Sequence, residues 1–191
     1  YLENNSIVDS FWGPSFLLIA LYTLITAENP GLRQNLLTAV VALWSLRLFY
    51  YITLRNWNKP EDYRYVHMRK RWGTKRPRLK AYANVFLLQG VLSYLVGLPL
   101  IRGNSSDVSS LSLLNYVGIA LFAIGFFFEA VGDAQLKNVK KDPANKGKLM
   151  TTGLWALTRH PNYFGESAMW FGFYLISYSG LKDLPFVFSP I

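Results

Sequence analysis

The chain has 191 residues, enough for one domain, and 51% of them are hydrophobic. It has no cysteine, which excludes disulfides and thiol chemistry, and it carries a formal net charge of +9. Its apolar residues form long blocks and lack the interrupted, amphipathic pattern of a soluble protein. The sequence therefore predicts an all-α, polytopic transmembrane bundle.

Four apolar blocks are long enough, or nearly so, to cross the hydrocarbon core, which takes about 20 residues of helix. A shorter fifth block follows, and a sixth begins near the end of the chain without completing a span. We therefore expect five to six spans in one transmembrane domain over residues 1–191, cut short at both ends, because the chain starts at Tyr1 and stops inside an apolar block. The blocks cover residues 10–27, 36–54, 81–101, 111–131, 167–181 and 185–191.

The basic residues concentrate in two connections. Of the 20 lysines and arginines, ten lie within residues 55–80 and six within residues 133–159, whereas the other connections carry one each: Arg33, Arg102 and Lys182. Two spans separate the rich connections, so both should emerge on one side, which the positive-inside rule makes the cytosol or the matrix. The endoplasmic reticulum and the bacterial or mitochondrial inner membrane fit this pattern equally.

A basic face of this kind also has a simple interpretation, which is that it sets topology and contacts anionic membrane lipids. Nucleic acid is not an expected partner, because no recognition module accompanies the charge. Residues 61–69 contain no helix breaker and are predicted to form a short interfacial helix, with Pro60 suited to its first position.

Two acidic residues, Glu129 and Asp133, stand four residues apart near the end of the fourth block. Lys137 continues the same stripe, so a helix-end ion pair would explain Asp133. Glu129 lies deeper, and ionisable groups within a span are costly and usually face a polar cavity, so we interpret it as functional. Arg47, inside the second block, either snorkels toward the basic side or lines the cavity that Glu129 and Glu166 enter.

Pro161 is predicted to begin the last span, which puts the positive end of a helix dipole beside Arg159 and His160. Free backbone N–H groups and a guanidinium there would form an anion site. A helix cap with Arg159 meeting a lipid phosphate explains the same pattern equally well. Neither a metal site nor a Gly-rich dinucleotide motif is expected, since the two histidines, His67 and His160, lie far apart in the sequence.

Eight segments carry recognisable motifs, namely residues 6–13, 55–57, 61–65, 69–73, 86–90, 128–133, 142–147 and 152–166. Together these segments resemble the steroid 5-alpha-reductase-like membrane proteins, and in particular an uncharacterised branch of that superfamily. The Arg-His-Pro motif alone is shared with isoprenylcysteine carboxyl methyltransferases and sterol reductases, whereas the combination is specific to the branch. The resemblance covers nearly the whole chain.

The resemblance implies a membrane enzyme whose basic loops close over NADPH, the hydride donor to a double bond conjugated with a carbonyl. In the related methyltransferases the same region holds S-adenosylmethionine. No catalytic tyrosine can be placed, so the catalytic candidates are Glu129 and Glu166. With the anion-site argument, the expected cofactor contacts are Glu129, Asp133, Lys140, Lys148, Arg159, His160, Asn162, Tyr163 and Glu166.

Three of these positions depart from the reductase pattern. The reductases have Asn where Glu129 stands and Arg where Lys140 and Lys148 stand. Lysine can hold a phosphate as a point charge but lacks the bidentate guanidinium fork, so NADPH stays plausible with weaker phosphate contacts.

Three functions follow from the sequence. The first is an NADPH-dependent reductase of a lipophilic enone, sterol-like or isoprenoid. The second is an S-adenosylmethionine-dependent methyltransferase of the isoprenylcysteine type, which would need no site for a 2′-phosphate. The third is a non-catalytic accessory subunit that retains the enzyme fold among other membrane subunits, since fold does not imply function.

Overall fold

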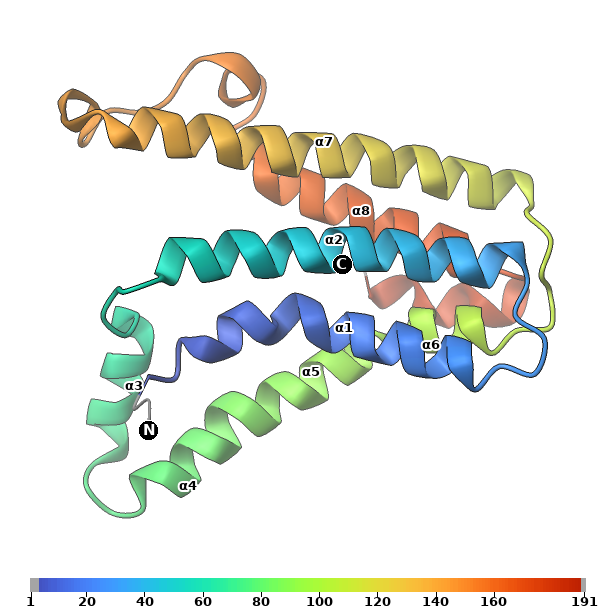
Figure 1. Cartoon of the computed structure of the whole chain (residues 1–191), viewed down its shortest axis with the longest axis horizontal. Helices are drawn as coiled ribbons and strands as arrows, with labels where there is room; N and C mark the ends of the chain where they lie inside the picture. Colours follow the sequence, from blue (N-terminus) through green and yellow to red (C-terminus); the bar gives the residue numbers. More distant parts are fainter. Residues whose placement is uncertain (1–3, 190–191) are drawn as a thin grey trace.

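The structure is a computed structural model that describes residues 4–189. Over this range the chain forms eight α-helices, one π-helical stretch and three 3-10 segments, with no β-strand. The all-α prediction is confirmed. Figure 1 shows the long helices running lengthwise, with the two basic connections at the same end of the bundle, as the charge pattern predicted.

Four helical stretches in the described range are long and apolar enough to cross a membrane. They are α1 (Ile7–Ile25), α2 (Leu32–Asn56), the continuous run Pro77–Val96, and α7 (Leu113–Lys141). These stretches correspond to the first four predicted blocks, although α7 continues well past the expected end at residue 131. They indicate an integral multi-pass membrane protein.

The third predicted block is not one uninterrupted helix. The run consists of α4 (Pro77–Ala81), the π-helical η1 (Tyr82–Leu87) and α5 (Leu88–Val96), and α6 (Leu98–Asn104) follows as a separate helix. The break falls at Gly97, where a Cβ atom would lie 3.1 Å from the Ile19 side chain of α1. Pro99 follows directly in the first turn of α6, a position that proline tolerates.

The helix of the fifth predicted block begins at Pro161, as predicted, but it covers α8 (Pro161–Ser177) and not residues 167–181. It is not among the helices long and apolar enough to cross a membrane, so four of the five to six predicted spans are found in the described range. At 17 residues α8 is about 25 Å long, and much of it is buried against neighbouring helices. The apolar residues after position 185 do not start a sixth span within the described range. They belong to a 3-10 segment, η4 (Leu181–Phe188), and residues 190–191 of that block lie outside the described residues.

An aromatic cluster at the centre joins α1, α2 and α8. Trp170 of α8 lies between Phe16 of α1, at 4.8 Å between ring centroids, and Trp44 of α2, at 5.5 Å. The edge-on geometry of both pairs is the one that aromatic quadrupoles favour. Phe173 and Phe122 extend the cluster to α7, so α1, α2, α7 and α8 share one core.

The helix α3 (Tyr63–Trp72) runs across the basic end of the bundle (Figure 1). It starts after Asp62, whose carboxylate accepts from the Arg64 backbone N–H at 2.9 Å, and so Pro60 is not its first residue, contrary to the prediction. Hydrogen bonds from the Arg64 side chain and backbone lower the pKa of Asp62. The Tyr65 hydroxyl donates to Asp9 of α1 at 2.5 Å, and burial and this bond raise the pKa of Tyr65.

At the opposite end, Arg33 is not the surface charge that the sequence indicated. Its side chain is 1% exposed and donates to the carbonyls of Val108, Ser177 and Gly103 at 2.8, 2.6 and 3.1 Å. Gly103 and Ser177 belong to the last turns of α6 and α8, where carbonyls lack intrahelical partners and a cation is favoured. Arg33 therefore joins two helix ends and the loop before α7.

We expect Arg33→Met to lower the unfolding free energy by at least about 2 kcal/mol, because three or more buried carbonyls lose their donor. The measurement is thermal or denaturant unfolding of the purified protein in mild detergent. Lys182→Met is the matched control, since it removes an exposed cation on the same side. Equal stability of both variants would contradict a structural role for Arg33.

Candidate functional site

The candidate site depends on an unusually close contact between α7 and α8. Gly118, Gly125 and Gly132 recur every seven residues along α7, the period that keeps one face toward a partner helix. A Cβ added at Gly125 would lie 2.5 Å from the carbonyl oxygen of Gly165, and one added at Gly165 would lie 2.6 Å from the Glu129 amide nitrogen. Both distances are too short for any side chain, so the two backbones touch directly.

This contact brings the start of α8 against the acidic residues of α7. Beyond Gly125, Gly132 packs against Pro161, the first residue of α8. Glu129 and Asp133 lie on the same face and are 4% and 5% exposed. The carboxylates are therefore enclosed between two helices near the basic end of the bundle.

Arg47 of α2 bridges the two carboxylates. One guanidinium nitrogen lies 2.5 Å from Glu129 Oε1, and the other pairs with Asp133 Oδ2. Of the two sequence interpretations, the structure therefore supports Arg47 as a lining residue of the polar cluster. Asp133 pairs with Arg47 and not with Lys137, whose side chain is exposed.

Two polar residues of α8 complete the buried cluster. Asn162 donates to Asp133 Oδ1 at 3.5 Å, and Glu166, half-buried one turn further along, interacts electrostatically with Arg47. Within the described residues, Glu129 Oε2 and Asn162 Oδ1 are buried without a hydrogen-bond partner. Buried acceptors of this kind are rare in folded proteins, and an absent ligand is one physical reason for them.

The connection between α7 and α8 folds back over this cluster. Trp155 donates its indole N–H to the Gly132 carbonyl at 3.0 Å, and the Leu154 amide donates to Gln135 Oε1 at 3.0 Å. The centroids of the His160 and Tyr163 rings lie 5.1 Å apart, so aromatic groups lie at the N-terminus of α8. Trp155 and Gln135 position the connection, a role that the sequence patterns did not assign.

The predicted cofactor residues thus divide into an inner and an outer set. The inner set, brought together at the α7–α8 contact, is Glu129, Asp133, Asn162 and Glu166. The outer set has exposed side chains and is Lys140, Lys148, Arg159, His160 and Tyr163. Arg47 and Tyr51 join the inner set, because Tyr51 stacks 5.1 Å from the Arg47 guanidinium and interacts with Asp133. Among the predicted cofactor residues, acidic groups therefore lie inside and cationic groups at the surface.

We expect Gly125→Ala to destabilise the protein by about 1–3 kcal/mol, because the new methyl group overlaps the Gly165 carbonyl and forces α7 from α8. Thermal unfolding in detergent measures the change. Gly90→Ala is the matched control, since a Cβ there meets nothing within 4 Å. A harmless Gly125→Ala would show that the helices are not in backbone contact.

We expect Arg47→Met to cost about 3–5 kcal/mol of unfolding free energy, because it leaves two carboxylates buried without a cation. Adding Glu129→Gln and Asp133→Asn to it should recover most of that loss, since the charges are then removed together. Arg55→Met, an exposed arginine of the same helix, is the control. If the triple variant is no more stable than Arg47→Met, the ion cluster is not the cause.

Comparison with known proteins extends these observations. An uncharacterised protein of Schizosaccharomyces pombe is 27% identical to the chain. The alignment covers 92% of the chain but only 58% of that protein. A probable O-methyltransferase of Ustilaginoidea virens is 50% identical over 46 residues, 24% of the chain and 16% of that protein. A steroid 5-alpha-reductase of Gossypium hirsutum is 34% identical over 62 residues, 32% of the chain and 24% of that protein.

The chain thus spans less than two thirds of the length of each of these relatives. No solved structure matches it significantly. The family model described as "Protein of unknown function (DUF1295)" matches residues 1–191. The resemblance to steroid 5-alpha-reductases is therefore distant and partial, and the chain belongs to the DUF1295 family.

Proposed function

We propose that the protein is a membrane-embedded, NADPH-dependent reductase of a lipophilic enone, sterol-like or isoprenoid. The observation that supports this most is the pair of buried, unpartnered acceptors, Glu129 Oε2 and Asn162 Oδ1, between two helices at the basic end. Buried acceptors without donors favour a ligand that brings hydroxyl or amide donors to them.

The residues of the site fit NADPH chemically. The ribose hydroxyls and the carboxamide of the cofactor are donors, which Glu129 and Asn162 can accept. Its phosphates need cations, and Lys140, Lys148 and Arg159 are exposed on the segments that enter and leave the site. Lysine would hold a phosphate as a point charge, whereas Arg159 offers a planar fork.

The protein's own residues would bind and orient the cofactor and would keep water out of the site. Arg47 keeps Glu129 and Asp133 fixed as acceptors, and the α7–α8 contact holds Asn162 in register with them. NADPH, when bound, supplies the hydride. Glu129 Oε1 is committed to Arg47, so of the two catalytic candidates Glu166 is better placed to hold a proton toward the substrate carbonyl.

The partial relative named a steroid 5-alpha-reductase is consistent with this proposal. A lipophilic substrate could reach the site from the bilayer, because the spans expose many large apolar side chains. In a cofactor enzyme the protein positions the reactive atom beside the substrate and tunes its surroundings, and the buried cluster offers fixed polar groups for such a role.

A methyltransferase is the second candidate, and two observations favour it. The segment shared with a probable O-methyltransferase is 50% identical over 46 residues. The buried carboxylates also outnumber the one buried arginine among the cluster residues, and an excess of negative charge suits the sulfonium of S-adenosylmethionine.

We expect NADPH to raise the unfolding midpoint of the purified protein, by an amount equivalent to about 2.7 kcal/mol at a hundredfold excess over its dissociation constant. Arg159→Ala and Lys148→Ala should each weaken the effect, because a charged contact to phosphate is lost. Lys75→Ala, an exposed cation of the other basic connection, should leave it unchanged. The measurement is a thermal shift assay in detergent, repeated with NADH and S-adenosylmethionine.

The alternatives give different outcomes in this assay. A shift with S-adenosylmethionine alone would favour methyl transfer and overturn the reductase proposal. A folded protein that responds to none of the three ligands would favour the accessory-subunit function, with membrane subunits as its partners. Equal losses in Lys75→Ala and Lys148→Ala would mean that the cofactor binds the basic face without a defined site.

A further inference from the structure

A cavity lies on the other side of the basic end, where α3 meets the start of the third span. It has a volume of about 500 Å³, and none of the residues of the α7–α8 site lines it. Its cationic lining residues are Arg69 and Arg78, and its aromatic ones include Trp72, Tyr82 and Phe86. A cavity that is cationic and aromatic together suits an amphiphilic ligand with an anionic head.

The helices around the cavity are arranged to admit a membrane lipid. The third span contacts α1 near Gly97 and diverges from it toward the basic end, where α3 crosses (Figure 1). Only 11% of the apolar window of Pro77–Val96 is buried. Tyr82 and Phe86, which line the cavity, are 58% and 38% exposed, so part of the cavity lining lies on the exposed side of the span.

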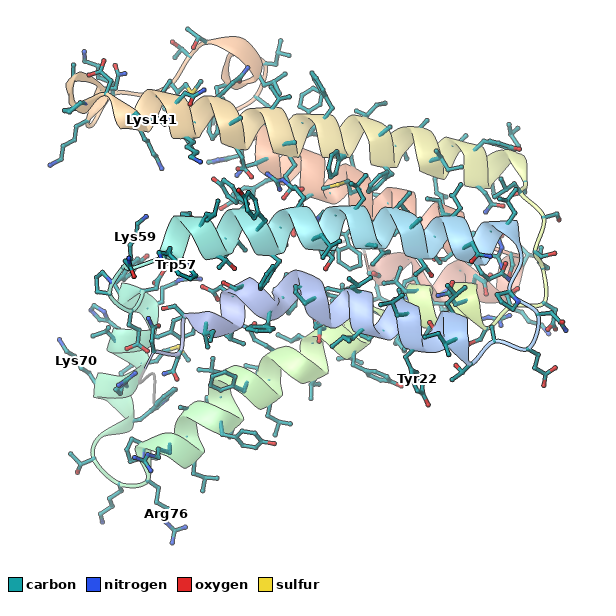
Figure 2. The ribbon with its side chains drawn as sticks, in the orientation of Figure 1. Tyr22, Trp57, Lys59, Lys70, Arg76 and Lys141 are labelled. Carbon is teal, nitrogen blue, oxygen red and sulfur yellow. The ribbon has the colours of Figure 1, made fainter. Side chains whose placement is uncertain are left out.

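Local contacts fix the charged rim of the cavity. Glu61 holds the Arg69 guanidinium at 2.7 and 2.8 Å, and Lys80 donates to the Trp72 carbonyl at 2.5 Å, which ties α4 to the end of α3. Further cations surround this corner: in Figure 2, Lys70 and Arg76 project outward from α3 and from the turn before α4. The rim is therefore preorganised and carries a net positive charge.

We propose that this cavity binds the headgroup of an anionic phospholipid, whose acyl chains lie along the exposed apolar side of the third span. The phosphate meets Arg78 and Arg69 at the rim, and the glycerol and upper chain segments contact Trp72, Tyr82 and Phe86. Aromatic side chains and arginines are the residues that proteins place at the headgroup level. Charge complementarity selects an anionic lipid over a zwitterionic one. The site is independent of the proposed cofactor.

The test uses the full chain, delipidated in neutral detergent, with phosphatidylglycerol and phosphatidylcholine of identical chains. Native mass spectrometry counts the bound lipid, and the unfolding midpoint reports its effect. We expect phosphatidylglycerol to remain bound and to raise the midpoint, and Arg78→Gln to weaken its binding about tenfold or more, the loss typical of a charge-assisted contact. Ala81→Trp, which fills the cavity without changing charge, should weaken binding comparably.

Lys141→Gln is the matched control, because Lys141 is an exposed cation at the same end of the bundle, on α7 (Figure 2). It should leave lipid binding unchanged. An equal loss in Lys141→Gln, or equal retention of the two lipids, would overturn the proposal in favour of diffuse attraction to the basic face. The same shift from glycerol phosphate alone would overturn the role of the acyl chains. None of these three results bears on NADPH binding.

Discussion

The close contact between α7 and α8 is the constraint on which the candidate site depends. With Gly125 and Gly165 in backbone contact, the first turn of α8 cannot move away from the acidic end of α7. Asn162 and Asp133 are thereby held within hydrogen-bonding distance, although they come from different helices. A site built on two packed helices is more rigid than one built on loops, and preorganised groups lose little on binding a ligand.

The glycines create a second requirement, which Arg47 meets. Helices packed this closely enclose Glu129 and Asp133 at membrane depth, where a carboxylate without a cation is costly. The cation comes from α2, so the ion cluster also joins α2 to the α7–α8 pair. One guanidinium cannot satisfy every oxygen, and Glu129 Oε2 keeps its acceptor capacity. The Arg47 ion cluster therefore both joins the three helices and leaves an acceptor at Glu129 for a ligand.

What the sequence predicted correctly is local in origin. Hydropathy and length indicated the four long apolar helices, although five to six spans were predicted, and the chemistry of proline indicated the start of α8, because each depends on residues close in the chain. The break at Gly97 was missed although Gly97 and Pro99 are local signals for a helix boundary, and the close approach of Ile19 adds a contact that lies far away in the sequence. The seven-residue spacing of the glycines in α7 was visible but was not used, and it would have indicated the α8 contact.

Arg33 and Arg47 illustrate the same limit. Arg33 was counted as a loop charge, yet its acceptors lie 70 to 144 residues further along the chain. The pairing of Arg47 with Asp133 could not be predicted from the sequence, because the two residues are 86 positions apart. Lys137 offered Asp133 a nearer partner on the same helix. In both cases burial and pairing follow from helix packing, which periodicity alone does not specify.

The two ends of the bundle differ in a way that matters for function. At the Arg33 end, Asn115 is also saturated, since it donates to the carbonyls of α8 and accepts from Ser112, so polar groups there close helix termini. At the basic end Glu129 Oε2 and Asn162 Oδ1 are buried without a donor among the described residues, and a ligand that brings donors would complete them.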